Sequence, residues 1–174
     1  MKKAFILLIL VQLFFVSCDE IQLKEKTVDC YFQYEYVNYA WGFNHSGFTI
    51  TPSGEVFAFD KSAAWVFADN NKLSFANLKK NIEASSKVDM IITKSDLDYY
   101  QQLAFVAFSG KISEPVQRGA DMGEIICKII VPDTVDPLGD YREVILTEKG
   151  DFDRYNLSPE SATIAEWLTN LVID

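Results

Sequence analysis

The feature that most constrains the fold is an aromatic-rich run, VDCYFQYEYVNYAW, over residues 28–41. Its period-two alternation and its tyrosines and phenylalanines are typical of a strand with one face toward the core. Two further strand-like segments, GFTIT at residues 47–51 and EVFAFD at residues 55–60, follow it. Pro-Ser-Gly separates these two and favours a type I turn. We therefore predict a three-stranded antiparallel meander over residues 28–60.

Three later segments carry helix-start signals. Ser74, Thr93 and Ser158 each precede a stretch with apolar residues at helical spacing: FANLKKNIEA, KSDLDYYQQLAFVAFSG and PESATIAEWLTNLVI. Short hydroxyl side chains are preferred N-caps. Pro159 then occupies the first helical position of the last segment, and Gly110 ends the second. These signals predict three helices.

Two more apolar segments, EIICKIIV at residues 124–131 and YREVILTE at residues 141–148, read as strands. Strands, helices, strands and a final helix indicate an α+β fold. We predict a largely antiparallel sheet of about five strands packed with about three helices. A single domain over residues 28–174 is the expected organisation, because a chain of this length can bury one core.

The N-terminus carries a different signal. Lys2 and Lys3 precede 13 residues, 4–16, in which Gln12 is the only polar side chain. A membrane-spanning helix needs about 20 apolar residues. The run is too short for that, and its charged start is typical of an export signal.

The segment FVSC at residues 15–18 resembles the lipobox of bacterial lipoproteins, with Phe15 where leucine is usual. The resemblance implies that residues 1–17 are a removed signal peptide and that Cys18 carries acyl chains. Two or three acyl chains anchor a domain firmly to a membrane. Residues 18–27 then form a polar tether. The body also resembles small bacterial lipoproteins of unassigned function, through NYAWG, GDFDRYNLSP and EWL.

Charge excludes one class of partner. The chain has 16 basic and 25 acidic residues, and loss of Lys2 and Lys3 with the signal leaves 14 against 25, a net −11. Such a body repels phosphate backbones, so we expect no nucleic-acid partner and a membrane contact made by the lipid at Cys18. Asp19 resembles an inner-membrane retention signal, whereas acidic residues after the cysteine elsewhere accompany surface export. We favour the outer membrane or cell surface.

The two other cysteines, Cys30 and Cys127, both fall on the apolar face of a predicted strand. An exported protein meets an oxidising compartment, so a disulfide between them is possible. Two separate buried thiols are the alternative, because free cysteine packs as a small hydrophobe.

Catalytic and metal motifs are absent from the sequence. With His45 as the sole histidine, sites that need two are excluded, and no nucleophile elbow, phosphate loop or HExxH occurs. We predict no catalytic residue, metal or cofactor. Asp151, Asp153 and Asn156 allow an irregular calcium loop as an alternative to a simple polar connection before the last helix.

Trp41, Phe43 and His45 lie in a segment flanked by Gly42 and Gly47. In an exposed bend, they could stack on a sugar ring or a peptide aromatic. Alternatively Trp41 fills the core and residues 44–47 are only a turn.

The function predicted from these features is a non-catalytic, lipid-anchored envelope protein that binds an envelope protein or glycan. A carboxylate-dependent hydrolase acting on glycans is the alternative, because paired carboxylates leave no short motif.

Overall fold

The computed structural model describes residues 27–60, 64–133 and 139–171. In these residues three helices accompany a nine-stranded sheet in which all pairs of strands are antiparallel. The α+β class, the three helices and the antiparallel sheet are confirmed. The predicted strand number, about five, is too low. Residues 1–26, including the predicted signal, Cys18 and most of the tether, lie outside the described residues.

The predicted meander is confirmed as β1 (Tyr31–Asn38), β2 (Asn44–Ile50) and β3 (Glu55–Asp60). The Gly54 amide donates to the Thr51 carbonyl at 2.9 Å and closes the turn between β2 and β3. Gly54 has φ +85°, and a Cβ there would lie 2.8 Å from the Ile92 carbonyl oxygen. Both constraints favour glycine at this position.

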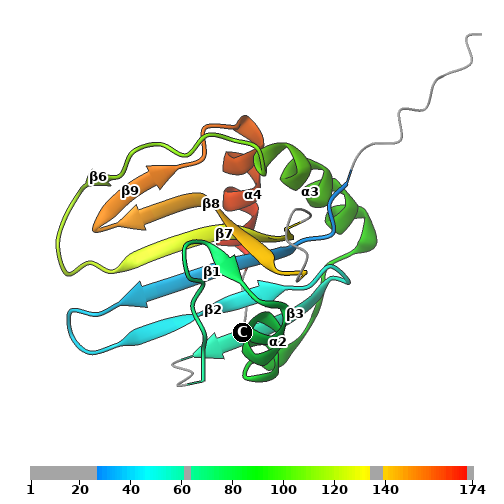
Figure 1. Cartoon of the computed structure of the whole chain (residues 1–174), viewed down its shortest axis with the longest axis horizontal. Helices are drawn as coiled ribbons and strands as arrows, with labels where there is room; N and C mark the ends of the chain where they lie inside the picture. The colour runs from blue at the N-terminus through cyan, green and yellow to red at the C-terminus, as the bar shows by residue number, and fades with distance from the viewer. Residues whose placement is uncertain (1–26, 61–63, 134–138, 172–174) are drawn as a thin grey trace, which may run out of the picture.

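The meander forms one half of the sheet and two long strands form the centre of the other (Figure 1). β1 pairs with β7, and β7 pairs with β8. The order is β5 (Ser86–Ile91), β3, β2, β1, β7 (Glu124–Pro132), β8 (Tyr141–Gly150), β9 (Phe152–Tyr155) and β6 (Val116–Gln117); β4 (Lys72–Leu73) also pairs with β8.

The strands missed by the prediction are short or lie at an edge. β4 and β6 have two residues each, too few for any periodicity to show. β5 pairs only with β3, and its residues are exposed except for half-buried Val88 and Met90. These strands are defined by their pairing with a strand that is distant in the sequence, and the local sequence does not indicate that pairing.

The helices begin where the capping signals predict. They are α2 (Phe75–Glu83), α3 (Lys94–Ala107) and α4 (Pro159–Asn170). The hydroxyls of Ser74, Thr93 and Ser158 accept hydrogen bonds from backbone amides three residues on, at 3.2, 3.2 and 3.3 Å. Each satisfies an amide that the first turn leaves unpaired.

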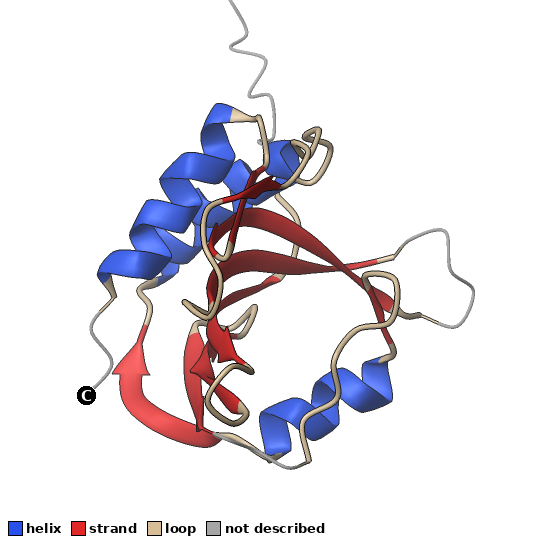
Figure 2. Ribbon diagram, turned by 90° about the vertical axis from the view of Figure 1, so that its left-hand side faces the viewer, coloured by secondary structure: helices blue, strands red, loops and turns tan. Residues whose placement is uncertain are grey.

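The helices lie on both sides of the curved sheet (Figure 2). α3 and α4 pack on one face, where they enclose the main core with Phe32, Ile129 and Leu146. There Tyr100 stacks on Trp167 with ring centroids 3.8 Å apart. α2 packs on the opposite face through a smaller cluster of Leu73, Leu78 and Ile130. The opposite face therefore has less apolar cover.

Cys30 and Cys127 are buried free thiols and do not form the disulfide that the sequence allowed. Cys127 is opposite Tyr34 in the β1–β7 register, and Cys30 lies four residues before Tyr34. At about 3.3 Å per residue this places the two cysteines about 13 Å apart along the strands, beyond disulfide reach. Burial raises the pKa of both thiols, which disfavours the reactive thiolate. The alternative of two separate thiols is confirmed.

Within the described residues no helix combines the length and apolarity needed to cross a membrane.

Candidate functional site

A row of buried polar side chains crosses the face of the sheet on which α2 packs. The strand register aligns Thr49 of β2, Gln33 of β1 and Lys128 of β7. Glu35 lies two residues from Gln33 and so on the same face. All four are at most 5% exposed. Alternation thus directs Phe32 and Tyr34 of β1 to the main core and Gln33 and Glu35 to the other face.

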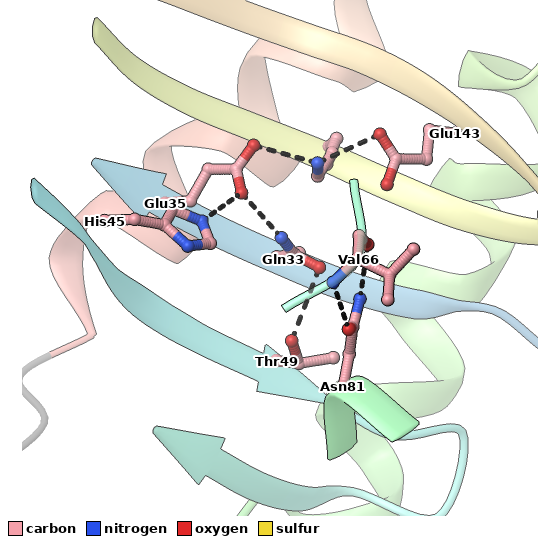
Figure 3. A network of polar contacts seen from close by, with 8 residues as sticks. Gln33, Glu35, His45, Thr49, Val66, Asn81 and Glu143 are labelled. Carbon is pink, nitrogen blue, oxygen red and sulfur yellow. Dashed lines mark hydrogen bonds and ion pairs between the residues drawn. The ribbon is translucent and has the colours of Figure 1, made fainter. Parts of the chain in front are cut away.

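Lys128 joins two carboxylates in this row (Figure 3). Its Nζ lies 2.8 Å from Glu35 Oε1 and 2.9 Å from Glu143 Oε2 of β8. Glu35 Oε2 also accepts from Gln33 Nε2 at 2.9 Å and lies 3.0 Å from His45 Nε2. Both oxygens of Glu35 therefore have partners, as a buried carboxylate requires.

Burial and ion pairing oppose each other at Glu35. Burial would raise the pKa of its carboxyl, but Lys128 and His45 outweigh it and lower the pKa to about 2. Burial would lower the pKa of Lys128, whereas Glu35 and Glu143 raise it above the ordinary value of 10.5. Both groups are therefore charged at neutral pH.

His45 lies in strand β2, completely buried, and not in an exposed bend. The rings of Phe59, Trp65 and Phe67 lie 4.8, 5.0 and 4.9 Å from its ring centroid. Its Nδ1 has no hydrogen-bond partner in the described structure. His45 therefore does not face an exposed site as predicted, because its Nε2 lies 3.0 Å from Glu35 Oε2 and aromatic rings surround it in the interior.

The segment around Val66, which covers this face of the sheet, is held in place by two hydrogen bonds to Asn81 of α2. The Val66 amide donates to Asn81 Oδ1, and Asn81 Nδ2 donates to the Val66 carbonyl, both at 2.8 Å. This cover and the full burial of His45 close the polar row to a substrate. We interpret the row as a structural network and not as a catalytic site.

The other two predicted residues lie at the turn between β1 and β2. Trp41 is 87% exposed and Phe43 is 44% exposed. Trp41 therefore does not fill the core, and residues 44–47 belong to β2 instead of a turn. The structure adds Tyr39 (69% exposed), whose ring centroid is 5.3 Å from that of Phe43. We call Tyr39, Trp41 and Phe43 the aromatic turn.

A cavity of about 360 Å³ lies beside the aromatic turn and is lined by Tyr39, Asp121, Glu124 and Asp151. Burial, and then the charges of Glu148 and Asp151, raise the pKa of Glu124. Sequence reasoning missed this cavity, because its lining comes from three separate segments, residues 37–40, 121–124 and 151, which the pairing of β1, β7 and β8 brings to one end of the sheet.

The three residues of the calcium-loop alternative each make a contact of their own in the structure. Asp151 Oδ1 accepts from the Met122 amide at 2.9 Å, while Asp153 pairs with Arg118 at 2.8 Å. Asn156 Nδ2 donates to the Ala107 carbonyl at 2.8 Å. The three side chains thus have separate partners. Over the described residues, no group of three or more acidic, histidine or cysteine side chains is arranged to hold a metal.

Comparison with protein-family models, curated proteins and solved structures found no match for the chain.

We predict that Glu35→Gln lowers the free energy of unfolding by about 3 kcal/mol at pH 7, because it removes one charge of a buried pair. Denaturant titration measures this. The depressed pKa of Glu35 means that its stabilisation is present above about pH 4.5 and is lost as the pH falls toward about 2. The wild type should therefore lose more stability than the variant in that window.

Glu55→Gln is the matched control, because Glu55 pairs with Lys87 at the exposed surface. It should change stability little. Equal stability of Glu35→Gln and the wild type across pH 7 to 2 would contradict the assigned network.

Proposed function

We propose that this chain is a lipid-anchored envelope protein whose domain binds an envelope protein or glycan without catalysing a reaction. The observation that carries the proposal is the aromatic turn. Large aromatic side chains are normally buried, and Trp41 is 87% exposed. Tyrosine and tryptophan supply much of the energy of protein interfaces, and an aromatic face also packs on a sugar ring.

The position of the aromatic turn supports a role in binding. Figure 1 shows the β1–β2 connection at one end of the sheet, with α3 toward the other end. The described chain begins at residue 27, on the α3 side. A membrane anchor before residue 27 would thus join the domain at the end opposite the aromatic turn. The anchor itself rests on the lipobox resemblance at Cys18.

One observation favours the alternative function, a carboxylate-dependent hydrolase. The cavity beside the aromatic turn contains Asp121, Glu124 and Asp151, and the pKa of Glu124 is raised. A carboxyl with a raised pKa can act as a general acid, and two carboxylates about 5 to 10 Å apart are the arrangement that glycosidases use.

The binding proposal predicts that Trp41→Ala weakens retention of an envelope ligand by at least about tenfold, because a central aromatic anchor contributes about 2 kcal/mol or more. Immobilised wild-type and variant proteins are compared in pull-downs with envelope proteins and on arrays of envelope glycans. Tyr99→Ala on α3 is the matched control, because Tyr99 is 50% exposed and lies away from the turn.

Equal retention by the wild type and Trp41→Ala would contradict binding through the aromatic turn. Release of glycan fragments that disappears in Glu124→Gln would instead support the hydrolase.

The proposed lipid anchor at Cys18 leads to a separate prediction. Cys18→Ala should abolish incorporation of labelled palmitate and release the protein from the membrane fraction, because each buried methylene contributes about 0.8 kcal/mol. Mass spectrometry of the mature N-terminus is the direct measurement. An unmodified Cys18 in membrane-bound protein would overturn the anchor, while the binding test remains independent of it.

A further inference from the structure

A second cavity, of about 340 Å³, opens at the edge of β8 and shares no lining residue with the cavity beside Tyr39. Phe108, Arg142, Ile145 and Arg154 are among its lining residues. The chain has three arginines and a formal net charge of −9, yet two of the three meet here. Their convergence opposes the negative charge of the rest of the molecule.

The cavity lies where the sheet is interrupted. β4 pairs with residues 141–142 of β8, and β9 pairs with residues 147–148. In between, the Glu143 amide donates to the Asn71 carbonyl at 2.8 Å, and the Leu146 carbonyl accepts from the Asn156 amide at 2.9 Å. Along this side of β8, no strand of the described chain pairs with residues 143–146. The gap leaves room for a ligand at a strand edge.

Arg142 provides a positive charge in this cavity with which an anionic ligand could pair. Its guanidinium lies 4.2 Å from the ring centroid of Phe108, and among the described residues it forms no ion pair with a carboxylate. Stacking uses the face of the guanidinium and leaves the N–H donors at its rim available. The orientation suits recognition of an oxyanion by two parallel hydrogen bonds.

The neighbouring charges do not cancel Arg142. Glu143 also lines the cavity, but its carboxylate pairs with Lys128 at 2.9 Å. Arg154 pairs with Glu148, whose side chain is 8% exposed. Glu143 shares Lys128 with Glu35, and the residues that line the cavity carry two positive charges, on Arg142 and Arg154, against the single carboxylate of Glu143.

We propose that this cavity binds a small organic anion, with its oxyanion on Arg142 and Arg154 and its apolar body against Phe108 and Ile145. The volume of about 340 Å³ lies at the lower end of the range for ligand pockets, about 300 to 1,000 Å³. Carboxylate and phosphate monoester share the required chemistry: a planar or tetrahedral oxyanion attached to an apolar group. The site is independent of the proposed function of the aromatic turn.

Arginine side-chain NMR tests the site directly, because the three arginines give three Nε–H signals. The full chain, purified in detergent with ¹⁵N-labelled arginine, is titrated with benzoate, phenyl phosphate and inorganic phosphate at constant ionic strength. Benzoate or phenyl phosphate should shift the signals of Arg142 and Arg154 in a saturable way, and the stronger of the two identifies the preferred oxyanion. The Arg118 signal should stay unchanged, because Arg118 pairs with Asp153 outside the cavity.

Variants complete the test. Arg142→Gln should weaken binding of the preferred probe by at least about tenfold, because a hydrogen bond to a charged group contributes about 1.5 to 3 kcal/mol. Arg118→Gln should bind as the wild type does. Equal shifts of all three signals, or shifts without saturation, would show ionic screening only and overturn the site. Saturation by inorganic phosphate at the same concentration as phenyl phosphate would overturn the role of Phe108 and Ile145.

Discussion

The ammonium group of Lys128 holds together a face of the sheet that apolar packing alone does not cover. It lies between carboxylates on β1 and β8, and the strands that carry these three groups are neighbours at the centre of the sheet. A buried charge destabilises a fold unless its partners are in place. The network therefore ties the pairing of β1, β7 and β8 to one register, since a shift of one residue would turn these side chains into the main core.

The sequence allowed the meander, the helix starts and the α+β class to be predicted, because these depend on local signals. Ser74 and Thr93 cap their helices by accepting from amides three residues further along the chain, and the turn at Gly54 is closed by a hydrogen bond within residues 51–54. The edge strands could not be predicted in the same way. β5 does alternate weakly through Val88 and Met90, but its pairing with β3 depends on tertiary contact.

The candidate site was predictable only in part. Trp41 and Phe43 are exposed as a stacking surface requires, whereas His45 is buried beside Glu35. The sequence does contain a signal for the polar row: Gln33 and Glu35 alternate with aromatics in β1, and Lys128 interrupts the apolar residues of β7. A polar residue in an otherwise apolar strand indicates a buried partner, but which strand supplies it follows only from the sheet order.

The most direct test of this account is the protonation and protection of the Lys128 ammonium, observed by NMR of ¹⁵N-labelled lysine. The account predicts a slowly exchanging ammonium signal with contacts to the side chains of Glu35 and Glu143. The signal should persist above pH 10.5, because the two carboxylates raise the pKa of Lys128. A rapidly exchanging Lys128, or one that loses its proton at or below pH 10.5, would contradict the buried network.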